Sequence, residues 1–417
     1  MRSILFHVPA WFVTDILFWL WLAACVVIVG VSWRRQGWSA ETKGYLLPMA
    51  VVAGLIRFVF PLLVQGDDGL PIRGYGVLLL AGIVSAVLLA VQRARQRGID
   101  PEHIYSLAFW VVACGLVGAR AYYVIKAWPE FQRPTLVQTI LAIVNIPEGG
   151  LVVYGSLFGA VIAIAVYVYR HRLPILVIAD ITAPSMMVGL ALGRIGCFLN
   201  GCCFGGTCDA PWALTFPWQS PPFVQHVDQG LIYLHGVKFA ADEQGHPVVS
   251  DVEPNSLAAA QGLAPGQRIV MVQGLPATSV EFVKRVLLST GPGDEVSLVT
   301  AGDPTPRHWA LNLPAERSLP IHPAQLYAAL GATLVLFLLL AIEPYRQHDG
   351  ELFAIFLIAY PVLRFSEELL RRDEPTIAGL KLAQWISVAL FVAGLTLLAF
   401  LRTRRKETLP QLQVSSN

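Results

Sequence analysis

The feature that most constrains this chain is a series of long apolar runs. A helix needs about 20 mostly apolar residues to cross a bilayer. Nine runs of roughly that length occur, at residues 11–31, 46–64, 75–91, 104–125, 151–169, 176–199, 325–342, 352–370 and 382–401. A further run, at 136–144, has nine residues, too few to span, and fits a re-entrant or interfacial arm. The sequence therefore predicts a polytopic α-helical membrane protein with about nine transmembrane helices.

Composition supports this prediction and excludes other classes of protein. Of the 417 residues, 55% are hydrophobic and 14% are charged, whereas soluble domains carry roughly a quarter charged residues. A cytosolic enzyme, a disordered chain and a disulfide-stapled mini-protein are therefore excluded. Because 30 Lys and Arg residues are balanced by 28 Asp and Glu residues, no nucleic-acid partner is expected.

The distribution of basic residues predicts the orientation in the membrane, because short cytoplasmic loops are enriched in Lys and Arg. Basic residues follow the first, third, fifth and last runs, at Arg34, Arg35, Arg93, Arg95, Arg97, Arg170, Arg172, Arg402, Arg404, Arg405 and Lys406. The alternate loop at 66–70 is acidic. We expect an outside N-terminus, an inside C-terminus and an outside location for the polar interval that follows Cys203.

That polar interval, residues 220–317, has no long apolar run and is predicted to form a soluble module. A capped short helix at 252–263, a Gly-Leu-x-Pro-Gly turn and an alternating strand ending at Gly274 follow one another. A second helix is expected at 280–288 and a later strand at 295–300. The pattern resembles a PDZ domain, a fold that binds peptides by adding a strand to a sheet edge. A β-rich spacer without a ligand is the alternative.

Two polar clusters stand at the ends of apolar runs, where ionisable groups are costly and point to function. In residues 193–205, four glycines allow close backbone approach and Arg194 supplies a forked donor suited to phosphate. The alternative is an arginine that extends to the interface beside small packing residues. In the second cluster, Tyr360, Arg364 and Glu368 fall on one helical face. Either Arg364 and Glu368 pair structurally, or Arg364 holds an anionic headgroup and Glu368 orients it.

These clusters, with several further motifs, resemble the prolipoprotein diacylglyceryl transferase family. The stretch 193–205 is similar to the glycine-arginine signature of that family. The remaining motifs follow in the family's order: Tyr75-Gly76, Gly118-Ala119-Arg120, Ala179-Asp180, the six residues His322 to Tyr327, Arg364 with Glu368, and Gln384. The resemblance covers residues 73–218 and 320–401.

The resemblance implies an enzyme of the bacterial inner membrane with seven spans. It would transfer diacylglyceryl from phosphatidylglycerol to the lipobox cysteine of prolipoproteins, recognised through their signal peptides, and would need no cofactor. The expected parts are two added helices (1–72), a first core segment (73–219), a periplasmic PDZ-like insertion (220–317), a second core segment (318–402) and a cytoplasmic tail (403–417).

The resemblance also implies site residues, and one departure stands among them. The family has a His-Gly-Gly motif where this chain has Tyr154-Gly155-Ser156. The usual proton acceptor is therefore replaced by a phenol, a group with a reference pKa of about 10. The expected catalytic residues are Arg194, Arg364, Tyr154 and Glu368. The expected substrate-binding residues are Tyr75, Arg120, Asn200, Gly205, His322 and Tyr360.

The signature also departs from the family by its cysteines. Cys197 stands where the family has an asparagine, and Cys202-Cys203 replace a Glu-Leu pair. Because the expected location is oxidising, a disulfide, such as one between Cys203 and Cys208, is the favoured interpretation. Reactive thiols at Cys197, Cys202 and Cys203 are an alternative that would give a covalent intermediate. No metal site is expected, since no Cys-x-x-Cys spacing or neighbouring His run occurs.

Two further functions stay open at this point. A related transferase that has lost the histidine would use an anionic phospholipid with a different small-molecule or lipid acceptor. A non-catalytic scaffold would instead recruit exported proteins through the PDZ-like module.

Overall fold

A computed structural model describes residues 4–37, 46–59, 61, 64, 69–145, 149–291, 294–310, 317–371 and 376–403. The basic tail beyond Thr403 and most of the acidic loop at 66–70 lie outside the described residues. The chain divides into two compact units. We call them the helical unit (Arg2–Gly196, Ala329–Phe365 and Leu382–Asn417) and the PDZ unit (Cys197–Ala328 and Ser366–Lys381).

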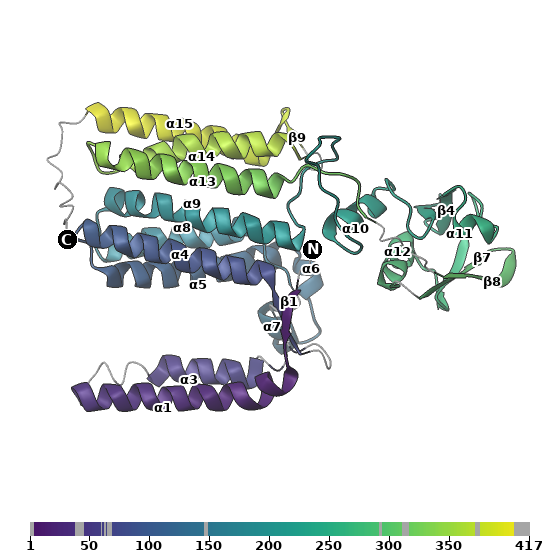
Figure 1. Cartoon of the computed structure of the whole chain (residues 1–417), viewed down its shortest axis with the longest axis horizontal. Coiled ribbons are helices and arrows are strands. Elements are labelled where there is room, and N and C mark those ends of the chain that lie inside the picture. Colours follow the sequence, from purple (N-terminus) through teal and green to yellow (C-terminus); the bar gives the residue numbers. More distant parts are fainter. Residues whose placement is uncertain are drawn as a thin grey trace. The chain divides into compact units, whose positions relative to one another are not determined.

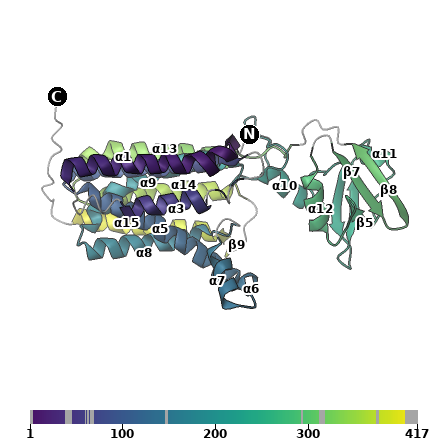
Figure 2. The ribbon, with the colours of Figure 1, turned by 90° about the horizontal axis from the view of Figure 1, so that it is seen from below.

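Long helices dominate the helical unit and run along a common direction (Figures 1 and 2). They are α1 (Leu17–Gln36), α4 (Gly74–Gln96), α5 (Pro101–Lys126), α8 (Val153–Arg170), α9 (Ile175–Asn200), α13 (Ala324–Ile342), α14 (Glu351–Leu369) and α15 (Leu382–Thr403). Within the described ranges, seven helices are long and apolar enough to cross a membrane, and they lie in all of these segments except α14. A polytopic α-helical membrane protein is therefore confirmed.

Nine spans were predicted, and two of the nine apolar runs are not among the seven helices that meet the length and composition of a span in the described residues. The second apolar run forms α3 (Leu46–Gly54) and the π-helix η2 (Leu55–Val59), which together are shorter than a span. The eighth run forms α14, which has 19 residues but carries Glu351, Arg364, Glu367 and Glu368. The described parts of both runs are helical as expected, and the four charged residues on α14 distinguish it from the seven helices above.

Shorter elements connect the long helices. Strand β1 (Ile4–Val8) pairs antiparallel with β2 (Leu70–Arg73) directly before α4. The nine-residue run forms α7 (Leu136–Val144), as expected for a segment too short to span, and follows α6 (Trp128–Phe131). The Thr135 hydroxyl caps α7 by accepting a hydrogen bond from the Gln138 amide. Helix η5 (Glu343–Tyr345) follows α13.

Glycines bring the helices into close contact. On the α5–α8 interface, a Cβ atom at Gly155 would lie 2.6 Å from the Cβ of Tyr122, and one at Gly159 would overlap the carbonyl oxygen of Cys114. A Cβ at Gly82 of α4 would lie 3.1 Å from the carbonyl oxygen of Gly189 in α9. Small residues allow such approach, which strengthens van der Waals packing where lipid supplies no hydrophobic driving force.

A buried carboxylate links the N-terminal parts of α9 and α14. Asp180 is fully buried, and its oxygens accept hydrogen bonds from the amides of Gly350 (2.8 Å) and Phe353 (2.9 Å). Gly350 directly precedes α14 and Phe353 lies in its first turn, so Asp180 acts as a helix cap supplied by another helix. Arg97 approaches the same carboxylate, with 3.9 Å between its guanidinium nitrogen and Oδ2, and also pairs with Asp349 at 2.9 Å.

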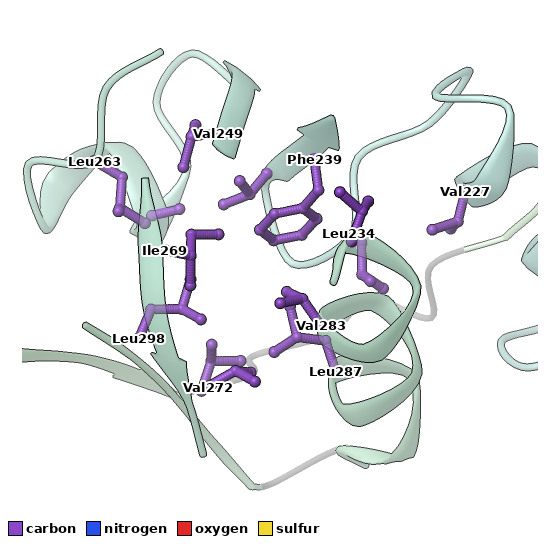
Figure 3. Packing of buried hydrophobic residues seen from close by; sticks show 14 of the residues in the cluster. Val227, Leu234, Phe239, Val249, Leu263, Ile269, Val272, Val283, Leu287 and Leu298 are labelled. Atoms are coloured by element: carbon purple, nitrogen blue, oxygen red, sulfur yellow. The ribbon is translucent and has the colours of Figure 1, made fainter. Parts of the chain in front are cut away.

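The PDZ unit contains a small sheet-and-helix domain with a hydrophobic core of aliphatic and aromatic side chains (Figure 3). Its elements are α10 (Pro221–Asp228), β3 (Val237–Ala241), β4 (Pro247–Val252), α11 (Leu257–Ala260), β5 (Ile269–Val272), β6 (Leu275–Pro276), α12 (Val280–Ser289), β7 (Glu295–Thr300) and β8 (Asp303–Ala310). Strands β3 and β4 pair, and the other sheet has the order β6-β5-β7-β8. The expected strand at 295–300 and the capped short helix are confirmed, and the expected helix at 280–288 is α12, one residue longer.

The two ends of this domain are joined to each other. The Phe216 amide donates to the Ser318 hydroxyl (2.8 Å), and the Ser318 amide donates to the Phe216 carbonyl (2.9 Å). Pro217 and Arg317 form an isolated β-bridge beside them. The chain therefore leaves and re-enters the rest of the unit at one place. The hairpin of β9 (Thr376–Ile377) and β10 (Leu380–Lys381) completes this unit.

Candidate active site

The predicted polar residues of the helical unit lie at one end of its helices. A buried cluster gathers Ala90 of α4, Ile104 of α5, Tyr167 of α8 and Ile181 of α9, among others. It therefore joins the C-terminal parts of α4 and α8 to the N-terminal parts of α5 and α9. The opposite end of these four helices carries Tyr75, Arg120, Tyr154 and Arg194.

The two arginines of the predicted phosphate site lie at a similar depth. Asp180 fixes the start of α14 beside α9, and both helices continue from this point in the same direction. Arg194 lies 14 residues after Asp180, and Arg364 lies 11 residues after Phe353. At the helical rise of 1.5 Å per residue these intervals are about 21 Å and about 16 Å. Both guanidinium groups are thus carried to the same end of the helical unit, far from the Asp180 cap.

Aromatic residues accompany the arginines at this end. A Cβ at Gly196 would lie 3.3 Å from the Tyr75 ring, so Tyr75 packs directly against the last turns of α9. Tyr154 stands in the first turn of α8, and its side chain is 37% exposed. Its neighbour Gly155 is in backbone contact with Gly118, which sets the position of this turn against α5. Tyr360 stacks on Phe356 with 5.6 Å between ring centroids.

Arg120 has a different environment from the one a substrate ligand requires. Its guanidinium donates to five main-chain carbonyls, those of Ala142, Ile143, Asn145, Gly149 and Gly150, at 2.6–3.1 Å. It also lies over the rings of Tyr123 and Phe131, at 5.7 and 5.2 Å from their centroids. All five N–H donors of an arginine are thereby engaged. In this structure Arg120 holds the C-terminal end of α7 and the glycines that follow it.

In the PDZ unit, the predicted residues gather around the loop that follows α9. The Gly205 amide donates to the His322 carbonyl (3.0 Å), and the His322 amide donates to the Gly206 carbonyl (3.0 Å). A Cβ at Gly205 would lie 2.7 Å from the Cβ of His322, which explains the need for glycine. Asn200 is the last residue of α9 and is half-buried. The side chain of Gln325 donates to the Cys202 carbonyl at 2.7 Å.

Glu368 has an ion-pair partner that the sequence analysis did not single out. Its carboxylate is fully buried, and Oε1 lies 3.6 Å from the Lys381 ammonium nitrogen. The same ammonium donates to the main-chain carbonyls of Glu368 (3.0 Å) and Arg371. The signal was present in the sequence as an isolated lysine directly before the last apolar run. Because the β9–β10 hairpin brings it back to Glu368, only the tertiary fold reveals the pair.

The cysteines are not cross-linked. All six are among the described residues and none forms a disulfide, so the expected Cys203–Cys208 disulfide is absent from the structure. Instead, the sulfur atoms of Cys197, Cys202 and Cys203 lie within 4.8 Å of one another. The absence of a Cys-x-x-Cys spacing therefore did not prevent a three-sulfur cluster.

The fold defines a multi-pass membrane protein that carries a small sheet-and-helix domain between two of its long helices. Comparison with known proteins gives the family. The profile of the prolipoprotein diacylglyceryl transferases matches residues 61–260 and 296–400, and the PDZ profile matches residues 228–301. The chain belongs to the prolipoprotein diacylglyceryl transferase family, is a transferase and contains a PDZ domain.

Individual relatives agree with this assignment, and all carry the name phosphatidylglycerol–prolipoprotein diacylglyceryl transferase. The protein of Rhodopirellula baltica is 32% identical over 97% of this chain and 90% of its own length. That of Pediococcus pentosaceus is 26% identical over 82% of this chain and 90% of its own length. That of Thermosynechococcus vestitus is 38% identical over 36% of this chain and 55% of its own length.

Proposed function

We propose that this chain transfers a diacylglyceryl group from phosphatidylglycerol to the lipobox cysteine of prolipoproteins in the bacterial inner membrane. The carbon–oxygen bond to the phosphate breaks, a thioether bond forms, and glycerol phosphate leaves. The observation that carries the proposal is the common depth of Arg194 and Arg364 on α9 and α14, set by the Asp180 cap. Membership of this family favours a prolipoprotein as the acceptor over a small molecule or lipid. It also favours a transferase over a non-catalytic scaffold that recruits exported proteins.

In the proposed mechanism, the two guanidinium groups bind the phosphate and offset the charge that develops on departing glycerol phosphate. Planar guanidinium forks bind phosphate oxygens bidentately. Charge stabilisation by fixed groups is strong where water is excluded. Tyr75 and Tyr360 of the helical unit shape the headgroup site, and Asn200, Gly205 and His322 of the PDZ unit stay predicted substrate-binding residues.

In this mechanism the phenolate form of Tyr154 accepts the proton of the attacking thiol and becomes the neutral phenol. Its exposed position in the first turn of α8 leaves it accessible to a substrate. Glu368, held by Lys381, fixes the last turn of α14 behind Arg364. Arg120 acts as a positioning residue, because its donors hold the segment after α7.

We also propose the orientation and a role for the PDZ domain. Arg93, Arg95 and Arg97 lie at the Asp180 end, which supports a cytoplasmic location for that end and a periplasmic PDZ domain. Strand β3 pairs with β4 along one edge, and α12 contacts β3. A peptide segment of an exported protein would bind as an added strand beside β3.

The transfer reaction is tested with purified protein in phosphatidylglycerol vesicles and a lipobox peptide. Mass spectrometry should show the peptide with one thioether-linked diacylglyceryl group. Arg194→Ala and Arg364→Ala should each lower kcat/KM by about 10²–10³-fold, the effect of removing one charge-stabilising donor. Arg170→Ala, at the exposed C-terminus of α8, is the matched control and should retain activity. An unmodified peptide in the presence of bound phosphatidylglycerol would rule the proposal out.

The role of Tyr154 is tested by removing only its hydroxyl group. Tyr154→Phe keeps the ring and should lower kcat by about 10²–10⁴-fold with little change in KM, since general bases contribute on that scale. Tyr154→His restores the family's residue and should keep most of the activity. A fully active Tyr154→Phe variant would show that another group takes the thiol proton.

A further inference from the structure

The end of α9 has a geometry that brings two cysteines together. Gly201 has a φ of 75°, in the left-handed region. Its amide donates to the Phe198 carbonyl (3.1 Å), and the Cys202 amide donates to the Cys197 carbonyl (3.1 Å). These are the two hydrogen bonds of a Schellman motif, in which the residue after the glycine contacts a residue of the last helical turn. Here those two positions, usually apolar, are Cys202 and Cys197.

The next residue adds a third thiol. Cys203 has a φ of 60°, a backbone conformation that non-glycine residues seldom adopt. Together the three residues place their sulfur atoms within 4.8 Å of one another, and none of the three forms a disulfide. A single apolar contact would complete the helix end, so the Schellman motif does not account for the third cysteine.

Residues distant in sequence hold the loop that carries the thiols in place. Gln325 donates to the Cys202 carbonyl at 2.7 Å, and the Gly205–His322 hydrogen bonds fix the residues that follow. Cys203 is exposed, whereas Cys197 and Cys202 are half-buried. The cluster is therefore held in place by its surroundings and is open to solvent on one side.

We propose that Cys197, Cys202 and Cys203 form a binding site for one soft, thiophilic metal ion of the Zn²⁺ or Cu⁺ type. Zinc–sulfur bonds are about 2.3 Å long, which places tetrahedral sulfurs about 3.8 Å apart. The observed separations, all within 4.8 Å, exceed that spacing by at most about 1 Å. Soft thiolates select such ions over Mg²⁺ or Ca²⁺. The exposed side of the cluster leaves a fourth coordination position for water or another ligand.

The test uses the full chain in detergent, reduced, freed of metal and kept under inert gas. Cd²⁺ is the probe, because thiolate–cadmium bonds give an ultraviolet charge-transfer absorption. The titration should saturate at one Cd²⁺ per chain, with Zn²⁺ competing. Since bound thiols must be deprotonated, the affinity should rise with pH. Bound Cd²⁺ should also protect Cys203 from alkylation, read from peptide masses.

Single variants make the site specific. Cys197→Ser, Cys202→Ser and Cys203→Ser should each weaken Cd²⁺ binding at least tenfold. Cys208→Ser, five residues further on, and Cys114→Ser in α5 are matched controls and should bind as the parent does. Cys203→Ser replaces an exposed side chain and keeps the test valid even if the helix-end variants misfold. Two results would overturn the proposal. The first is a chain whose six thiols are all reduced but whose Cd²⁺ absorption does not saturate. The second is a saturable absorption that is the same in Cys203→Ser as in the parent.

Discussion

The PDZ domain and the helical unit are stabilised in opposite ways. In the PDZ domain, Val283 and Leu287 of α12 are almost completely buried against the sheets. In the helical unit, large apolar side chains such as Phe109 (64% exposed) and Ile125 (76% exposed) point away from the neighbouring helices. Water drives apolar groups into a core, whereas lipid does not. The helical unit therefore depends on glycine contacts and on buried polar groups such as Asp180.

The largest expected effect comes from a glycine of the α5–α8 interface. Gly159→Leu places a side chain against the backbone of Cys114 and should destabilise the helical unit by more than about 3 kcal/mol, beyond ordinary overpacking. Thermal unfolding in detergent and the yield of monodisperse protein measure this loss. Gly30→Leu in α1, where nothing lies within 4 Å of the added Cβ, is the control. Equal stability of the two variants would mean that close packing does not hold α5 to α8.

A paired truncation measures the difference between the two regions directly. Leu287→Ala should cost the PDZ domain about 2–5 kcal/mol, the usual loss for a buried leucine. Phe109→Ala removes a larger side chain from the surface of α5 and should cost the helical unit less than about 1 kcal/mol, because little packing is lost. Amide hydrogen exchange in the full chain reports both regions in one sample. A greater loss for Phe109→Ala would reverse the comparison.

The smallest expected effect is a pH dependence confined to the PDZ domain. Burial lowers the pKa of His235, while its Nε2 lies 2.9 Å from the Leu287 carbonyl oxygen. Because the folded domain resists protonation, its stability is full above the unfolded-state pKa of about 6.5 and falls as the pH drops below that value.

Hydrogen exchange of β3 and α12 between pH 7.5 and 5 measures this decline. His235→Gln, which cannot take up a proton, should flatten the profile without changing exchange in α5 or α8. A decline of the same size in His235→Gln would assign the effect to another group.

Periodic and local features of the molecule were predictable from the sequence. Apolar length located the helices, and turn residues with alternation located α12 and β7. The arginines at span ends were recognisable because a charge is costly in a membrane. These signals lie within about 20 residues of one another, the range over which helical and strand patterns repeat.

Contacts between distant segments were not predictable. Lys381 meets Glu368 through a hairpin, and Asp180 meets Gly350 across 170 residues of chain. The five carbonyls around Arg120 come from a segment whose path no pattern specifies. The prediction of a disulfide was wrong. It was based on an oxidising location outside the membrane, whereas the Schellman turn at the end of α9, which brings Cys197 and Cys202 together, depends on backbone geometry. Among the described residues, length and composition single out seven of the roughly nine predicted spans, because a π-helix follows α3 and charges lie on α14.

The hydrogen-bonded pair of Phe216 and Ser318 has a consequence for how the parts of this protein can be separated. Chain ends that meet at one place can be rejoined by a few residues without moving anything else. The same holds for β1 and β2, which bring the start of the chain back beside Arg73 before α4 begins. The PDZ domain and the segment that holds the first two helices therefore each begin and end at one place in the fold. Either could be exchanged or removed in a chimaera while the transferase helices keep their connections.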